Sequence, residues 1–188
     1  GRPSVVAIRT AHGIDETELL RLTASLERSS EHPLAAAIVR AAGERGLTLV
    51  PPTGFDSPVG KGVVGAVEGR KLVIGNQRIM AEAGIDTSGL STAADDLRKD
   101  GGTAIFVAVD GKAAGIIAIA DPIKATTPAA IAALKDAGIR VVMLTGDNRT
   151  TAEAVAAKLG ITEVEAEVLP EDKSKIVERF RAEGRAVA

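Results

Sequence analysis

The feature that most restricts the fold of this 188-residue chain is a change of pattern at Asp121-Pro122. Before it, apolar runs of strand length are joined by short turns, and Asp110-Gly111 between two such runs is a strong hairpin signal. After it, helical and strand patterns alternate, which is typical of a parallel sheet flanked by helices. The sequence therefore predicts two domains, residues 1–120 and 121–188.

The first domain is predicted to be an α+β unit built on an antiparallel sheet, because its strand patterns come in adjacent pairs. The periodicities and turn signals predict the following elements: a short extended opening segment (1–12), helices at 15–28 and 34–42, a loop at 50–61 with a short strand at Phe55, a hairpin of 63–67 and 71–74, a short helix capped by Asn76, a helix at 90–99, and a hairpin of 103–109 and 112–119.

The second domain is predicted to be an α/β piece with helices at 128–137, 150–159 and 172–181 and strands at 140–144 and near Val164. Residues 185–188 have the pattern of the opening of one more strand. Because an α/β sheet is not expected to end there, we expect the chain to be a piece of a longer protein.

Composition excludes several classes of function. The chain has no Cys, two His and two Met, which argues against a soft-metal site within it. A formal net charge of -2 and only three aromatic residues, all Phe, argue against nucleic-acid binding. The longest apolar run, 113–120, is far shorter than the roughly 20 residues of a membrane-spanning helix, and no signal peptide is recognised, so we expect a soluble, intracellular chain.

The glycine-rich string from Gly60 to Gly65 fits the pattern G-x-G-x-x-G. A dinucleotide-binding fold needs a strand before this pattern and a helix after it, but here a Pro-rich loop precedes it and a hairpin follows. A kinase loop is excluded because the sequence lacks the kinase motifs that should follow downstream. A P-loop is excluded because Gly62 stands where that motif requires Ser or Thr. Two interpretations stay open: Gly60 and Gly62 let a ligand approach the backbone, or they form a bulge that bends a strand.

A second polar cluster, Glu27 to Leu34, joins two predicted helices. Pro33 disfavours a helical conformation at His32, which places the imidazole at the start of the second helix. There it can exchange hydrogen bonds with a heteroaromatic ligand, while Glu27 can accept from an exocyclic amine such as that of adenine. Ordinary capping of the helix ends by Ser29, Ser30 and Glu31 is the alternative.

Taken in order, five motifs resemble those of heavy-metal (class IB) P-type ATPases: Ser30-Glu-His-Pro-Leu34, Gly60-x-Gly62-Val63-x-Gly65, Gly75-Asn76, Asp121-Pro122 and Thr145-Gly146-Asp147. Their order and spacing agree over essentially the full chain. The resemblance implies a nucleotide-binding domain with an antiparallel sheet, joined to a truncated phosphorylation domain of the haloacid-dehalogenase-like, Rossmann-type α/β class.

The resemblance also implies roles for individual residues. Those that line the ATP pocket are Glu27, His32, Gly60, Gly62 and Asn76. Those that support the phosphoryl group are Thr145, Gly146, Asp147 and Lys173. ATP is thus the expected ligand, with a Mg²⁺ site mostly outside the chain.

The family's phosphorylatable aspartate lies in an Asp-Lys-Thr-Gly-Thr motif, which this sequence lacks; Asp172-Lys-Ser-Lys175 opens a helix and has no Gly. The resemblance therefore implies a monomeric cytoplasmic piece that presents ATP to an aspartate elsewhere in an integral plasma- or inner-membrane transporter. Its partners would be the rest of the phosphorylation domain, the actuator domain and the transmembrane domain. The string from Gly75 to Met80 resembles copper exporters more than zinc or cadmium ones. A haloacid-dehalogenase-like phosphatase and a non-catalytic nucleotide-binding module are the alternatives.

Overall fold

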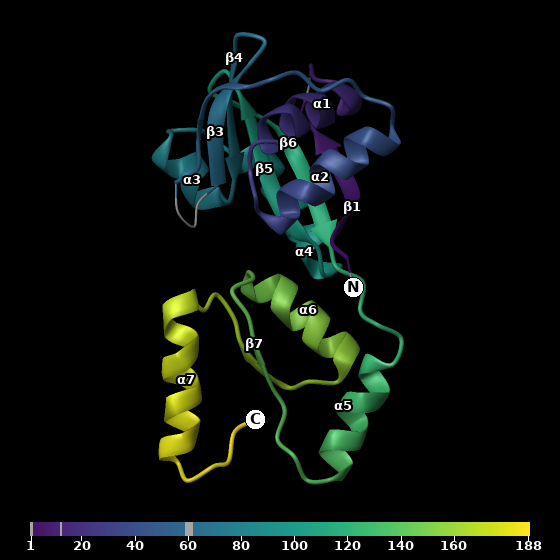
Figure 1. Cartoon of the computed structure of the whole chain (residues 1–188), viewed down its shortest axis with the longest axis vertical. Coiled ribbons are helices and arrows are strands. Elements are labelled where there is room, and N and C mark those ends of the chain that lie inside the picture. Colours follow the sequence, from purple (N-terminus) through teal and green to yellow (C-terminus); the bar gives the residue numbers. More distant parts are fainter. Residues whose placement is uncertain (1, 12, 59–61) are drawn as a thin grey trace. The chain divides into compact units, whose positions relative to one another are not determined.

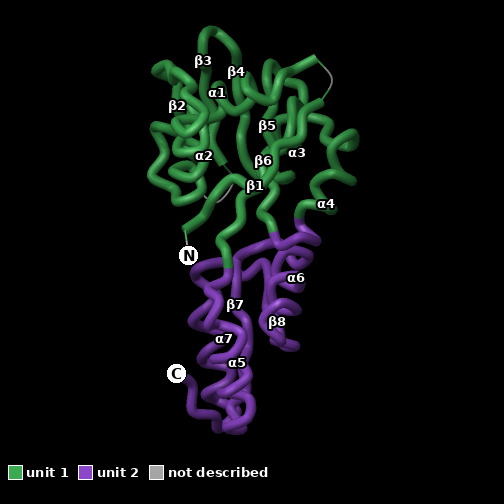
Figure 2. Tube along the Cα trace, turned by 90° about the vertical axis from the view of Figure 1, so that its right-hand side faces the viewer, with its two compact units in different colours: residues 1–97, 102–122 green, residues 98–101, 123–188 purple. Residues whose placement is uncertain are grey.

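The computed structural model describes residues 2–11, 13–58 and 62–188. The chain divides into two compact units: Gly1–Leu97 with Gly102–Pro122, and Arg98–Gly101 with Ile123–Ala188 (Figure 2). The main break along the chain falls between Pro122 and Ile123, close to the change of pattern in the sequence.

The first unit is built on a six-stranded sheet whose neighbouring strands are all antiparallel, in the order β1-β6-β5-β4-β3-β2. This confirms the predicted antiparallel α+β fold. Its elements are β1 Ser4–Thr10, α1 Glu16–Glu27, α2 Pro33–Glu44, β2 Thr53–Asp56, β3 Gly62–Val67, β4 Arg70–Gly75, α3 Gln77–Glu82, a 3-10 turn Ser88–Leu90, α4 Ser91–Lys99, β5 Thr103–Val109 and β6 Lys112–Ala120.

Both faces of this sheet are covered by helices (Figure 1). Side chains alternate between the faces of a strand, so Ile105 and Val107 pack with α1 and α2, whereas Ala104 and Phe106 pack with α3 and α4. The central strands are consequently apolar on both sides. The fold therefore has two hydrophobic clusters separated by one sheet.

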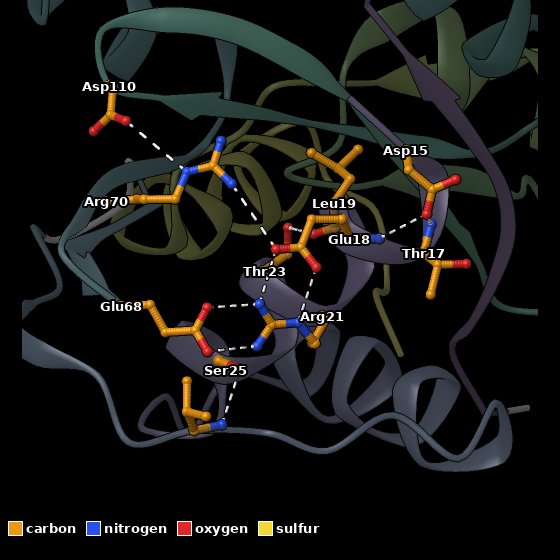
Figure 3. Close-up of polar contacts among 11 residues, drawn as sticks. Asp15, Thr17, Glu18, Leu19, Arg21, Thr23, Ser25, Glu68, Arg70 and Asp110 are labelled. Atoms are coloured by element: carbon orange, nitrogen blue, oxygen red, sulfur yellow. Dashed lines mark hydrogen bonds and ion pairs between the residues drawn. The ribbon is translucent and has the colours of Figure 1, made fainter. Parts of the chain in front are cut away.

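Helix α1 begins where Asp15 caps it, because the Asp15 carboxylate accepts hydrogen bonds from the backbone N–H groups of Thr17 (3.1 Å) and Glu18 (3.3 Å). Further along, the Arg21 guanidinium pairs with Glu18 in the same helix (2.8 Å) and with Glu68 in the β3–β4 turn (2.7 Å; Figure 3). The second pair fixes the middle of α1 beside the far end of β3.

The second unit contains α5 Thr127–Asp136, β7 Val142–Leu144, α6 Arg149–Leu159, β8 Glu163–Glu165 and α7 Pro170–Ala182. Strands β7 and β8 pair in parallel, as the alternating pattern predicts. Only four of its described residues are buried, and neither α5 nor α7 contains a buried residue. The buried residues are Thr151, Ala152, Ala156 and Ile161.

One prediction for this unit is wrong: residues 185–188 do not form a strand. A strand exists through hydrogen bonds to a neighbouring strand, and the Arg185 N–H instead donates back to the Phe180 carbonyl at the end of α7. The four residues have an irregular conformation and line a cavity together with residues of β7 and α7.

Candidate functional site

Glu27 is the most unusual residue of the first unit. It is the last residue of α1 and is only 7% exposed, yet its carboxyl group forms no hydrogen bond or ion pair with any described residue. Burial raises the pKa of Glu27 to about 7 by disfavouring the charged form. The C-terminal end of a helix is also the negative end of its dipole, a costly place for an acid. An acid kept in such a position is typical of a functional site.

The Glu27 carboxyl group is nevertheless not completely enclosed by the protein. The described residues contain no fully buried side-chain oxygen or nitrogen that lacks a hydrogen-bond partner. Because Glu27 has no such partner, its oxygens must retain some contact with solvent.

His32 lies at the start of α2, in the extended conformation that Pro33 predicts (φ −68°, ψ 138°). It is exposed, and its Nδ1 accepts a hydrogen bond from the Leu34 N–H (3.2 Å). That bond assigns the proton of the neutral ring to Nε2, which is then a donor toward solvent or a ligand. The capping alternative holds in a modified form: His32 itself caps α2, while the Ser30 hydroxyl accepts from the His32 N–H (3.3 Å).

Gly62 and Asn76 lie at the same end of the β3–β4 pair, since Gly62 pairs directly with Gly75. Gly62 has φ +147°, and a Cβ at this position would lie 2.0 Å from the Ile74 carbonyl oxygen. The strand pairing alone therefore requires glycine here. Asn76 caps α3 as predicted, its Oδ1 accepting from the Ile79 N–H (3.0 Å). Gly60 lies outside the described residues.

The direction of α1 relates these groups to one another. Arg21 contacts Glu68 at one end of β3, and Leu26 lies against Gly65 in the middle of the strand. Helix α1 thus runs antiparallel to β3. Its last residue, Glu27, therefore lies toward the N-terminal end of β3, where Gly62 is located.

In the second unit, Thr145, Gly146 and Asp147 follow the carboxyl end of β7, where ligands bind in parallel α/β sheets. The last residue of β8 and the segment after it hold this turn through backbone bonds: Thr145 N–H to Glu165 O (3.0 Å), Glu167 N–H to Asp147 O (2.9 Å) and Val168 N–H to Thr145 O (3.0 Å). The Thr145 hydroxyl also accepts from the Asp147 N–H (3.1 Å).

Two helices begin beside this turn. Asn148 caps α6 by accepting from the Thr150 N–H (2.9 Å), and α7 begins two residues after Val168. Lys173 is exposed in the first turns of α7, and its ammonium group forms no ion pair among the described residues. In contrast, Lys175 pairs with Asp172 (2.8 Å). The structure therefore brings the predicted phosphoryl-site residues to one edge of the β7–β8 sheet.

None of these residues lines either of two cavities in the described part of the chain. One of about 750 Å³ is lined in the first unit by residues that include Thr10, Asp86 and Lys112. The other, of about 650 Å³, is largely apolar and lies between β7, α7 and residues 185–188. Neither gathers the polar groups that an ATP site needs.

Within residues 2–11, 13–58 and 62–188, no three His, Cys, Asp or Glu side chains are arranged to hold a metal ion. In the same part of the chain, no helix combines the length and the apolar character needed to cross a bilayer.

A family model of haloacid dehalogenase-like hydrolases matches residues 3–188. The chain belongs to this family. A silver exporting P-type ATPase of Salmonella typhimurium is 52% identical over 188 residues, which are 100% of this chain and 23% of that protein. A zinc-transporting PIB-type ATPase has a structure similar to 97% of this chain and 29% of its own, with 36% identity and a TM-score of 0.68.

The N-domain of a copper-transporting P-type ATPase also matches, with a TM-score of 0.54 and 25% identity. The match covers 63% of this chain and 99% of that domain. These similarities confirm the resemblance to heavy-metal P-type ATPases and the predicted fold class. The chain spans about a quarter of the length of its curated relatives.

Sequence reasoning missed two parts of the site. The 165–168 segment, which holds the Thr145–Asp147 turn, carries no motif, because its contribution is made by backbone groups of Glu165, Glu167 and Val168. The packing of the Leu26 side chain against Gly65 was also not predicted. The third glycine in the Gly60–Gly65 string is a visible signal that another group approaches the strand closely there.

Proposed function

We propose that the chain is the ATP-presenting part of a heavy-metal-translocating P-type ATPase, with residues 1–120 as its nucleotide-binding domain and 121–188 as part of its phosphorylation domain. The observation that carries this proposal is Glu27, a buried acid without a partner among the described residues that keeps contact with solvent. Such a group is stabilised by a ligand that donates a hydrogen bond to it.

Adenine supplies the complementary groups. Its exocyclic amine can donate to Glu27, and its ring nitrogens can accept from the Nε2–H of His32, five residues further on. In this proposal Gly60 and Gly62 present backbone groups to the nucleotide, and Asn76 lines the pocket beside Gly62. No aromatic ring is required, in keeping with a chain that contains only three.

The second unit would support the phosphoryl group during its transfer. The Thr145 hydroxyl and the N–H groups of Gly146 and Asp147 lie at a strand end beside two helix N-termini, which favour anions. Lys173 would add a positive charge there. Mg²⁺, when bound with ATP, would neutralise phosphate charge, but the described residues do not provide a complete site for it.

The attacking aspartate would come from elsewhere in the longer protein, since this sequence has no Asp-Lys-Thr-Gly-Thr motif. We place the chain on the cytoplasmic side of a membrane transporter, as a monomer whose partners are the remaining phosphorylation, actuator and transmembrane domains. Copper(I) is the proposed cargo, because the Gly75–Met80 string resembles copper exporters more than zinc or cadmium ones.

The proposal is tested by titrating the chain with ATP in a calorimeter and by incubating it with γ-labelled ATP and Mg²⁺. We expect binding in the micromolar-to-millimolar range without acid-stable label. Glu27→Ala should weaken binding by about tenfold or more, the effect of losing a hydrogen bond to a ligand. Acid-stable label on the chain would contradict the absence of a nucleophile, and release of phosphate from simple phosphate esters would favour the phosphatase alternative.

A further inference from the structure

Helix α1 rests on the sheet at two glycines. A Cβ at Gly65 in β3 would lie 2.5 Å from Leu26 Cδ1, and one at Gly115 in β6 would lie 2.6 Å from Leu19 Cδ2. Leu19 and Leu26 are two helical turns apart and both are 0% exposed, so they project from the same face of α1. Each leucine occupies the space that a side chain would fill if a residue other than glycine stood at that position of the sheet.

The two glycines differ in what else surrounds them. A Cβ at Gly115 would also lie 2.4 Å from the Arg9 carbonyl oxygen, so a side chain there would disrupt the pairing of β1 with β6. At Gly65 the next neighbours are Thr53 O at 3.2 Å and Phe55 Cα at 3.4 Å, and only the flexible end of Leu26 is closer. A methyl group at Gly65 would therefore act mainly on the Leu26 side chain, which is 0% exposed and passes the displacement on to the last turn of α1.

We propose that Gly65 is a positioning residue for nucleotide binding. By leaving room for Leu26 against the sheet, it holds the next residue, Glu27, at its buried depth at the end of α1. An added methyl group would lift this turn and move the carboxyl group out of place. Binding groups must be held to within about 0.5 Å of their productive geometry, so the displacement weakens binding without removing a contact to the ligand. The inference rests on the proposed function of Glu27.

The first test is Gly65→Ala, compared with Val67→Ala in the same strand. Val67 is 0% exposed, and its truncation loosens the core without adding volume beneath α1. By calorimetry we expect Gly65→Ala to weaken ATP binding about tenfold, the loss of one ligand hydrogen bond, and Val67→Ala to change it by less than about twofold. Equal losses in the two variants would overturn the proposal.

The second test restores space beneath the helix in the Gly65→Ala background. Leu26→Met keeps the volume with a side chain that can bend away, and Leu26→Ala removes the clashing atom altogether. Both should recover most of the lost affinity, although Leu26→Ala lowers the unfolding midpoint further. A double variant whose ATP affinity rises while its unfolding midpoint falls is not expected if Gly65 has only a structural role. If neither double variant binds better than Gly65→Ala, or if all of these variants fail to fold, the proposal is wrong.

A third readout needs no nucleotide. The carboxyl titration of Glu27, followed by carbon NMR, should move toward the ordinary value for glutamate in Gly65→Ala, because the residue becomes more exposed. It should stay unchanged in Val67→Ala. If the wild-type chain does not bind ATP but this titration moves, the proposed function fails while the positioning of Glu27 by Gly65 stands.

Discussion

The two units differ in how they hold their helices. In the first, helices cover both faces of a six-stranded sheet, and several side chains of α1 are completely buried. In the second, α5 and α7 bury no residue, and order comes from a two-stranded sheet, helix caps and backbone bonds around Thr145. The first unit thus has a core of its own, whereas little apolar surface holds the second unit together within this chain.

The candidate sites differ in the same way. The site in the first unit depends on burial, because Glu27 owes its raised pKa to its depth beside the sheet. The site in the second unit is made of the half-buried Thr145 and of exposed groups such as Lys173, and their placement depends on strand ends and helix starts. Changes in packing should therefore alter the first site more than the second.

The largest expected effect is a difference in amide hydrogen exchange between the units. Exchange from a packed core needs nearly global opening, whereas helices without buried residues open locally. Amides of β5 and β6 should be protected at least about 10³-fold more than those of α5 and α7, a difference of about 4 kcal/mol in opening free energy. Exchange measured by NMR on the whole chain gives both values in one sample. Equal protection of α5 and β5 would show that the second unit has a source of stability that its burial does not reveal.

The next largest effect is on stability through Glu27. Because its pKa rises from 4.5 in the unfolded chain to about 7 in the folded one, folding favours the protonated acid. Stability from this group is complete below pH 4.5, falls between pH 4.5 and 7, and stays low above that range. Glu27→Gln, which resembles the protonated form, should equal the wild type near pH 4 and exceed it by about 3 kcal/mol at pH 8.

The chain has no Trp, so urea unfolding of Glu27→Gln is best followed by circular dichroism at each pH. The hydrogen bond from Arg21 lowers the pKa of Glu18, so this carboxylate contributes to the stability curve with the opposite sign. Because Glu18 titrates alike in both proteins, subtracting the wild-type free energy of unfolding at each pH removes its contribution. A constant difference between the two proteins from pH 4 to 8 would mean that Glu27 is not a buried acid in solution.

Much of the fold could be predicted from local signals in the sequence. The Asp110-Gly111 turn, the cap at Asn76 and the change of pattern at Asp121-Pro122 each depend on a few neighbouring residues, and the structure has the hairpin, the helix start and the parallel strands that they predict. These features form wherever the local chemistry is the same, so a single sequence is enough to find them.

The burial of Glu27 could not be predicted in this way. Its depth depends on Leu26 packing against Gly65, nearly forty residues later in the chain. The glycine signals a close approach, but no local pattern shows that Leu26 is the residue that approaches it. The prediction for His32 was incomplete for a related reason. A histidine before proline predicts the position of the ring, but it does not predict which ring nitrogen accepts the hydrogen bond from the Leu34 N–H. The expected strand at 185–188 failed because pairing, rather than apolar sequence, makes a strand.

The smallest expected effect separates the two roles of His32. Its Nδ1 caps α2 through the Leu34 N–H, while the proposed contact to adenine uses Nε2. Asn is a strong N-cap residue, so His32→Asn should keep the cap and change stability by only a few tenths of a kcal/mol, whereas His32→Ala should cost about 1 kcal/mol. Both variants lose the Nε2–H donor and should bind ATP about tenfold more weakly by calorimetry. If His32→Asn binds ATP like the wild type, the imidazole acts only as a helix cap. Recognition of the adenine base in the first unit must then depend on Glu27 and not on His32.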